Sequence, residues 1–196
     1  NLKARYNVAP TQDAPVVRLG TSGRKLSSIR WSLVPSWSKE PRSKYNLINA
    51  RLESASEKPS FRSAFKSRRC LVPANGWYEW KTEEDGKQPY YIQPEEERLF
   101  AFAGIWERWD GAEGAFDSFS ILTTEALGPL QLIHHRMPVV ITDRDRFGAW
   151  IDPETPQGDL HGLLDMSDIT FKHVAVNRAV NNARHDAPDC IEPLAA

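Results

Sequence analysis

Residues 68–81 read RRCLVPANGWYEWK and contain two strand-like runs, Cys70–Val72 and Trp77–Lys81. Both runs use the branched and aromatic residues that β-strands favour. The sequence EEDG at residues 83–86 then joins the second run to a third, Pro89–Ile92, as the turn of a β-hairpin would. This stretch therefore predicts short antiparallel strands.

Similar patterns extend outward from this stretch in both directions. Further strand-like runs are Ser28–Val34, Leu99–Ile105, Phe119–Thr123, Pro138–Thr142 and Phe171–Val176. Helical signals are fewer and cover Ser60–Ser67, Glu125–Ile133 and Asp143–Trp150, the last opening with a possible N-cap. Fourteen prolines and eleven glycines favour many short elements. We predict a single domain over residues 1–196 with an α+β fold, predominantly antiparallel β in barrel-like twisted sheets, with short peripheral helices.

The composition is that of a soluble globular protein, with 40% hydrophobic and 26% charged residues. No apolar run approaches the roughly 20 residues that cross a bilayer, and the start does not resemble a signal peptide, so no membrane association is expected. The two cysteines, Cys70 and Cys190, form no CxxC motif. This pattern argues against a disulfide framework or a thiolate zinc site and favours a reducing, cytoplasmic compartment.

The net charge of -1 conceals an asymmetry between the two parts of the chain. Residues 1–70 hold 15 Lys/Arg against 4 Asp/Glu, a balance of +11, and residues 71–196 hold the remaining 10 against 22, a balance of -12. A half as basic as the first is typical of modules that bind nucleic acid. The alternative is that the two halves neutralise each other across the fold, and charge alone does not choose between them.

Asn49 and Arg51, within LINARLES at residues 47–54, form the first candidate site. Because they are two residues apart, they share a face if this segment is a strand. An amide and a guanidinium that project together can bind an anion or a backbone phosphate. The alternative is a surface salt bridge with nearby Glu53.

Glu79, the second candidate, lies between Tyr78 and Trp80. Aromatic neighbours can desolvate a carboxylate and raise its pKa, which lets it donate a proton near neutral pH. The alternative is a solvent-facing glutamate, the more common state of a lone glutamate in a strand.

The histidine pair His134 and His135 lies in QLIHHRMPVVI, residues 131–141, just before Arg136 and a strand-like run. Either ring could act as acid, base or electrostatic stabiliser, because free histidine titrates near about pH 6.5. Adjacent histidines point in different directions and do not form the two-ligand metal site of an HxxxH helix. No metal or other cofactor is therefore expected. The remaining histidines, His161, His173 and His185, show no companion pattern and are interpreted as structural.

Aromatic side chains are interleaved with the basic half of the chain, namely Trp31, Trp37, Tyr45, Phe61 and Phe65. Such a mixture holds single-stranded nucleic acid, because cations follow the phosphates and rings stack on bases. Most of these rings are expected in the core. Trp37, in the proline-flanked loop VPSWSKEP, is the one expected to be exposed. RYNVAPTQ at residues 5–12, taken alone, predicts a structural turn.

These segments together resemble successive signatures of one family, the SOS-response-associated peptidase (SRAP) domain. The matching stretches are ARYNVAP (4–10), WSLVPSW (31–37), INARLES (48–54), RRCLVPANGWYEWK (68–81) and IHHRMP (133–138). VNRAVNNARHDAPDCIEPL at residues 176–194 resembles its closing segment, so the likeness covers nearly the whole chain in the family's order.

The resemblance implies an abasic-site sensor in single-stranded DNA. In the family, removal of the initiator Met exposes an N-terminal cysteine, whose amine and thiol close a thiazolidine with the ring-opened sugar. Carried onto this chain, Asn49 would orient the cysteine, Glu79 would shuttle protons, and His134 would assist opening of the sugar ring. The peptidase label reflects self-removal of the leading residue.

The resemblance also implies a set of DNA contacts. Arg51 and Arg136 would grip phosphates beside the lesion, and Trp37 would stack against displaced bases. The N-terminal loop adds further expected contacts with DNA, Arg5, Asn7 and Pro10.

The start of the sequence departs from the family pattern. The chain opens with Asn1-Leu2-Lys3, downstream of where the Cys-Gly-Arg of the family is expected. Cys70, in an apolar strand pattern, and Cys190, near the C-terminus, do not fit the place of the nucleophile. Because the three catalytic candidates persist, we expect the cysteine to precede Asn1 rather than to have been lost.

Two other classes of function stay open. One is a non-covalent module for single-stranded DNA, and the upstream cysteine distinguishes it from the crosslinking sensor. The other is a cysteine-type peptidase acting on other proteins, which would need a nucleophile beside His134. The expected partner is single-stranded DNA containing abasic sites, bound by a monomer in the cytoplasm that associates with the nucleoid when on DNA.

Overall fold

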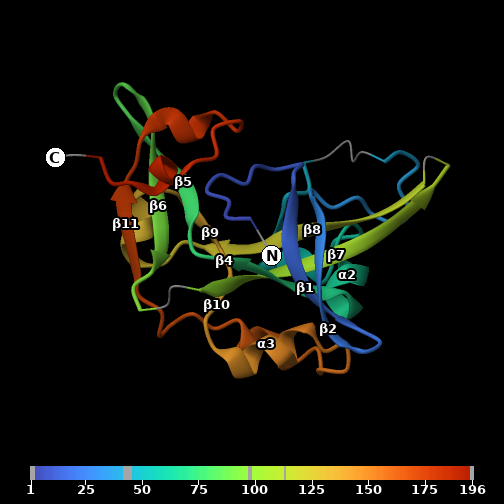
Figure 1. Cartoon of the computed structure of the whole chain (residues 1–196). Helices are drawn as coiled ribbons and strands as arrows, with labels where there is room; N and C mark the ends of the chain where they lie inside the picture. Colours follow the sequence, from blue (N-terminus) through green and yellow to red (C-terminus); the bar gives the residue numbers. More distant parts are fainter. Residues whose placement is uncertain (1–2, 42–45, 97–98, 113, 195–196) are drawn as a thin grey trace.

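The computed structural model describes residues 3–41, 46–96, 99–112 and 114–194, and strands dominate this part of the chain (Figure 1). In these residues five strands close into a barrel. They are β1 (Asp13–Gly20), β2 (Gly23–Trp31), β4 (Arg69–Ala74), β7 (Phe100–Gly111) and β8 (Gly114–Glu125). The neighbours β1–β2, β1–β4, β4–β7 and β7–β8 are antiparallel, and a parallel β2–β8 pair closes the ring. Closure leaves no free edge around the ring.

Short strands extend β8 and β7 beyond the barrel. β3 (Asn49–Arg51) pairs parallel with β8, and β9 (Arg136–Pro138) pairs antiparallel with the same strand. β10 (Val140–Ile141) pairs antiparallel with β7. The chain thus carries residues 49–51 and 136–138 to the same strand, which brings two sequence motifs together.

A second, antiparallel sheet stands beside the barrel (Figure 1). It consists of β5 (Trp77–Glu83), β6 (Gly86–Pro94) and β11 (Phe171–Ala175). Its β5–β6 hairpin turns where the EEDG sequence predicted, with Glu83 opposite Gly86. Gly86 adopts φ +124°, a conformation that side chains rarely tolerate, so glycine suits this turn.

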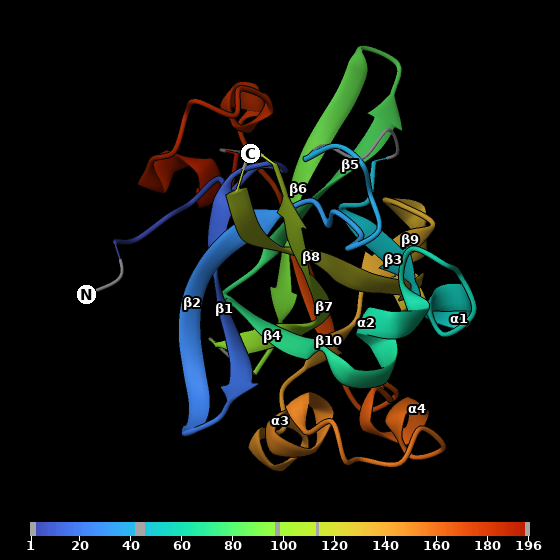
Figure 2. The same ribbon diagram turned by 90° about the vertical axis from the view of Figure 1, so that its right-hand side faces the viewer.

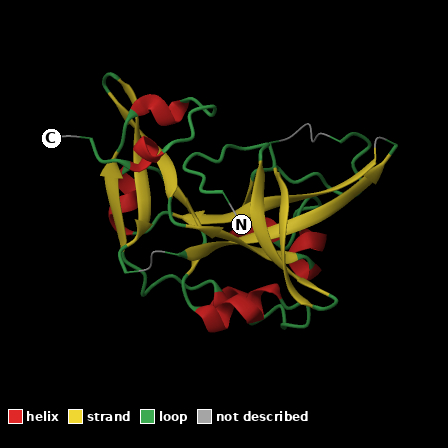
Figure 3. Cartoon of the chain, viewed as in Figure 1, coloured by secondary structure: helices red, strands yellow, loops and turns green. Residues whose placement is uncertain are grey.

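Helices are short and lie around the strands (Figure 3). They are α1 (Leu52–Ala55), α2 (Arg62–Ser67), α3 (Arg144–Ile151) and α4 (Leu160–Leu163). Figure 2 shows α3 and α4 side by side at one end of the molecule. The predicted N-cap is confirmed, because the Asp143 carboxylate accepts the Asp145 N–H of α3 at 2.8 Å. None of the described helices is long and apolar enough to cross a membrane.

The main core fills the barrel and the space between the barrel and α3. Phe119 and Ile105 are fully buried on the barrel strands, and Trp150 of α3 donates from its indole N–H to the Cys70 carbonyl at 2.9 Å. Arg69 is also buried, and its guanidinium donates to the carbonyls of Trp150, Phe65 and Lys66 at 2.6–3.0 Å, as well as to that of Asp152. These bonds satisfy the charge that burial would otherwise penalise and fix α2 and α3 to the barrel.

The predicted fold class is confirmed, while several predicted boundaries are wrong. The helix predicted over Glu125–Ile133 is a single 3-10 turn, η1 (Gly128–Leu132), because Gly128 has φ +50° and Pro129 lacks an N–H. The single strand predicted over Pro138–Thr142 is two strands, β9 and β10, that pair with different partners. β1, a full barrel strand, was not predicted at all.

Candidate functional site

Asn49 and Arg51 project together from the exposed face of β3. Both are exposed, whereas Ala50 between them is fully buried. The prediction that they share a face is therefore confirmed. β3 is held in register by its ladder with β8, and the indole N–H of Trp31 donates to the Ile48 carbonyl just before it at 2.9 Å.

Arg136 lies nearby, on β9, and pairs with Glu53. Its guanidinium makes two hydrogen bonds to the Glu53 carboxylate, at 2.8 and 2.9 Å, and a third to the Thr123 carbonyl at 2.6 Å. The bonds from Arg136 to the carboxylate hold the pKa of Glu53 below its ordinary value. The salt bridge considered for Arg51 is thus made by Arg136 instead, and no contact among the described residues joins Arg51 to Glu53.

Glu79 and His134 meet between the second sheet and the loop that follows η1. His134 Nδ1 lies 3.5 Å from a Glu79 carboxylate oxygen and 2.9 Å from the Arg136 carbonyl. The Arg136 N–H also points at this nitrogen, at 3.2 Å. The main chain of Arg136 therefore orients the imidazole beside the carboxylate.

Burial raises the pKa of Glu79 to about 7, and the charge of His134 acts in the opposite direction. The Glu79 side chain is 21% exposed, so the solvent-facing alternative does not describe it. Near neutral pH both its protonated and its ionised forms are populated. The same carboxyl can then donate a proton in one step and accept one in the next.

The loop after β2 presents Trp37 to solvent, with 63% of the residue exposed. The loop itself is fixed, because the Val34 N–H donates to the Ser118 hydroxyl at 2.8 Å and the Trp109 indole donates to the Ser38 carbonyl at 2.9 Å. The predicted exposure of Trp37 is confirmed. Among the other rings, Phe61 and Phe65 are buried as expected, Trp31 is partly buried, and Tyr45 lies outside the described residues.

The N-terminal loop is tied to the C-terminal segment, residues 176–194. Asn7 is buried, and its side-chain amide donates to the carbonyls of Val180, Asn182 and His185 at 3.0, 3.3 and 2.9 Å. These contacts support the structural interpretation of RYNVAPTQ.

Asp186 provides a second tie between the two segments. It accepts the N–H groups of Tyr6 and Asn7 at 2.6 and 2.9 Å and pairs with the Arg5 guanidinium. Arg5 also donates to Gln12, whereas Pro10 is exposed on the same loop. The role of Asp186 was not predicted, because its partners are about 180 positions away and no local pattern marks it.

The described residues contain one compact group of possible metal ligands, His185, Asp189 and Cys190, and it does not include Glu79 or His134. The second cysteine, Cys70, is fully buried, and burial raises the pKa of its thiol well above the ordinary value. A thiol held protonated in the barrel wall is a poor nucleophile. Cys70 therefore does not support the alternative that the protein is a cysteine-type peptidase.

Comparisons with known proteins identify relatives that match most of this chain. The chain is 38% identical over 191 residues to abasic site processing protein YoqW of Bacillus subtilis, covering 95% of this chain and 85% of the relative. It is 31% identical to abasic site processing protein HMCES of Xenopus tropicalis, covering 96% of this chain and 66% of the relative.

Solved structures show the same fold. A protein from Bacteroides thetaiotaomicron matches with a TM-score of 0.80 at 26% identity, over 94% of this chain and 82% of the other. A phage-related protein from Bordetella bronchiseptica matches with a TM-score of 0.72 at 30% identity, over 91% and 85%. The family model of the SOS response associated peptidase (SRAP) matches residues 1–183. The chain therefore belongs to the SRAP family.

Proposed function

We propose that this protein processes abasic sites in DNA by forming a covalent bond with the lesion in single-stranded DNA. The names of the relatives, from Bacillus to vertebrates, support abasic-site processing. The observation that carries the covalent step is the partly buried Glu79 carboxyl, with its pKa raised to about 7, in contact with His134. Amine–aldehyde condensation needs a group that both gives and takes a proton at neutral pH.

The reaction joins the ring-opened deoxyribose to an N-terminal cysteine. The first residue of the present sequence is Asn1, so this cysteine is not among the residues described above. The cysteine amine adds to the C1′ aldehyde and gives a carbinolamine. Neutral Glu79 protonates the departing hydroxyl, which leaves as water, and the nitrogen keeps its proton as an iminium ion. The Glu79 carboxylate so formed accepts the proton of the thiol, and the thiolate adds to the iminium carbon, closing a neutral thiazolidine. One water is released overall, and Glu79 is protonated again at the end.

His134 acts on the sugar before the condensation. Opening the ring requires a proton at the ring oxygen and removal of a proton from the C1′ hydroxyl, and a partly exposed imidazole can do either. Asn49, on the exposed face of β3, orients the amine and the main chain of the cysteine. The same proton-transfer groups would serve the self-removal of the leading methionine.

Phosphates on either side of the lesion bind Arg51 and Arg136. Arg51 is exposed, and no described residue pairs with it, so it is available to an anion. Arg136 would exchange Glu53 for phosphate as DNA arrives. Trp37 stacks on a displaced base, a contact worth about 1–3 kcal/mol. Pro10 and Arg5 extend the surface, while buried Asn7 contributes by fixing the loop. The protein acts as a single-domain monomer in the cytoplasm, at the nucleoid when bound.

The test uses the protein with its native, processed N-terminus and a single-stranded oligonucleotide carrying one abasic site. A DNA–protein band should survive a denaturing gel and vanish when the N-terminal cysteine is replaced by alanine. Glu79→Gln and His134→Ala should slow its formation at least tenfold, whereas Glu84→Gln, an exposed carboxyl of the β5–β6 turn, should not.

Absence of the band refutes the covalent mechanism. If the same oligonucleotide is still retained on a native gel, the protein is a non-covalent binding module for single-stranded DNA. If the band forms in Glu79→Gln as fast as in the wild type, Glu79 does not transfer the protons of the reaction.

A further inference from the structure

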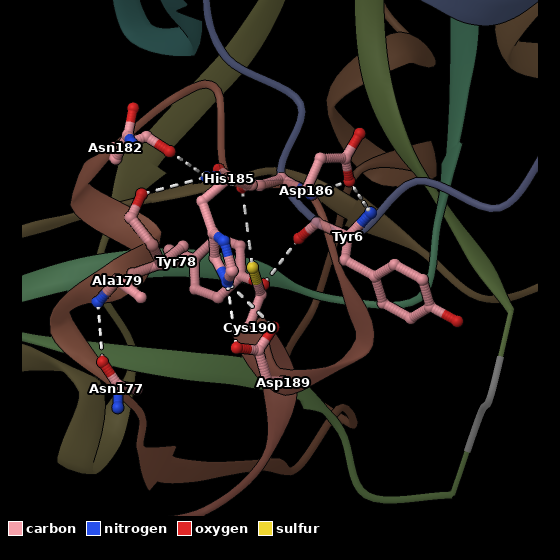
Figure 4. Close-up of polar contacts among 11 residues, drawn as sticks. Tyr6, Tyr78, Asn177, Ala179, Asn182, His185, Asp186, Asp189 and Cys190 are labelled. Carbon is pink, nitrogen blue, oxygen red and sulfur yellow. Dashed lines mark hydrogen bonds and ion pairs between the residues drawn. The ribbon is translucent and has the colours of Figure 1, made fainter.

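A second group of reactive side chains lies in the C-terminal segment, on and beside the 3-10 turn η3 (Pro188–Ile191). His185, Asp189 and Cys190 point toward one another, and their possible ligand atoms all lie within 4.8 Å (Figure 4). His185 Nε2 is 2.9 Å from both Asp189 carboxylate oxygens. The Cys190 Sγ donates to the carbonyl of His185 at 3.7 Å.

The donor set is specific in its chemistry. Thiolate, imidazole and carboxylate are the three side-chain ligands that zinc uses, at about 2.0–2.3 Å. Calcium and magnesium prefer oxygen ligands alone, so this mixture does not suit them. Three protein ligands leave the fourth position of a tetrahedral ion to water.

The backbone around the three side chains is already fixed. The His185 N–H donates to the Asn182 carbonyl at 2.8 Å, and the Cys190 N–H donates to the Ala187 carbonyl at 3.0 Å. The His185 carbonyl also accepts the Asn7 amide. A site held this way needs only side-chain rotation to close on an ion, which lowers the entropic cost of binding.

Exposure of the three groups gives a path into the site. The Asp189 and His185 side chains are 50% and 33% exposed, whereas Cys190 is fully buried beneath them against Val176 and Val180. An ion arriving from solvent meets the carboxylate and the imidazole first and the sulfur last.

We propose that His185, Asp189 and Cys190 bind one zinc ion, with water as the fourth ligand. Binding displaces the thiol proton of Cys190 and replaces the hydrogen bond between His185 and Asp189 with two bonds to the metal. The site lies beyond residue 183, where the family match ends, and it is independent of the abasic-site chemistry. The structure gives His185 two companions, Asp189 and Cys190, that its sequence pattern did not indicate.

The test is a titration of the chelator-treated protein with Co²⁺, followed by competition with Zn²⁺. Cobalt should saturate at one equivalent and give a sulfur-to-metal charge-transfer band in the near ultraviolet together with the visible bands of a tetrahedral ion. Stoichiometric Zn²⁺ should abolish both. Cys190→Ala should lose the charge-transfer band, and the matched variant Cys70→Ala, in the barrel wall, should keep it.

Asp189→Asn keeps the proposal testable if Cys190→Ala fails to fold, because Asp189 is exposed and contributes no core packing. This variant should weaken cobalt binding at least tenfold with an unchanged circular dichroism spectrum. Absence of the charge-transfer band in the unaltered protein overturns the proposal. So does equal affinity in Asp189→Asn, since the ion would then be held elsewhere.

Discussion

Replacing Glu79 by glutamine should make the protein more stable at alkaline pH. In the folded protein the ionised carboxylate is partly buried on β5 of the second sheet, which disfavours its charge. In the unfolded chain that cost is absent. Glutamine keeps the shape of the side chain but cannot ionise, so the pH-dependent cost disappears in Glu79→Gln.

The magnitude follows from the two pKa values of Glu79. Burial raises the folded pKa from an ordinary 4.5 to about 7. The favourable contribution of the neutral carboxyl is complete below the unfolded pKa and is lost as the pH rises through the folded one. Between about pH 5 and pH 8 the wild-type free energy of unfolding should therefore fall by about 2–3 kcal/mol relative to that of Glu79→Gln.

Urea denaturation followed by tryptophan fluorescence, repeated across this pH range, measures the difference. Glu84→Gln makes the same chemical change at an exposed turn and should follow the wild-type curve. Parallel curves for wild type and Glu79→Gln would show that the carboxyl is not desolvated. A variant that loses stability relative to wild type as the pH rises would show that the ion pair with His134 outweighs burial.

Three further perturbations test other contacts. His134→Ala removes the charge that lowers the pKa of Glu79, so the carboxyl, followed by carbon-13 NMR, should titrate at higher pH; an unchanged midpoint would contradict the contact. Asp186→Ala removes the acceptor for two N–H groups of the N-terminal loop and should cost about 2 kcal/mol, with faster hydrogen exchange there; unaltered protection would argue against the tie. Glu53→Gln removes the carboxylate that phosphate must displace from Arg136, so binding of an undamaged single strand, measured by fluorescence anisotropy, should tighten; unchanged affinity would mean that Arg136 contacts no phosphate.

The sequence predicted the parts of the fold that are written in local patterns. The β5–β6 hairpin and the Asp143 cap depend on residues within a few positions of each other, and both are where the patterns indicated. β1 escaped prediction because its stability comes from pairing with β2 and β4, and not from a strong strand pattern of its own. Ring closure through the parallel β2–β8 pair joins residues about 90 positions apart and leaves no local trace.

The candidate site likewise has features that local patterns predicted and contacts that depend on residues far apart in the sequence. Aromatic neighbours of Glu79 indicated its desolvation, and the two-residue spacing of Asn49 and Arg51 placed both on one face. The pairing of Arg136 with Glu53 joins residues 83 positions apart, and it could be found only in three dimensions. Adjacent motifs therefore predicted which residues are present, and the barrel determined which of them meet.

The ties between the two ends of the chain have a consequence for the order in which the protein is completed during synthesis. Every strand of the barrel, and β10 with it, lies before residue 142, whereas Asn7 and Tyr6 find their partners 173 to 180 positions downstream. On the ribosome the barrel strands can thus pair before Asn7 and Tyr6 meet their partners at residues 180–186. The Tyr78 hydroxyl of β5, which donates to the Tyr6 carbonyl at 2.6 Å, is available to the N-terminal loop much earlier. The loop is therefore secured in two stages, first by the second sheet and later by the C-terminal segment.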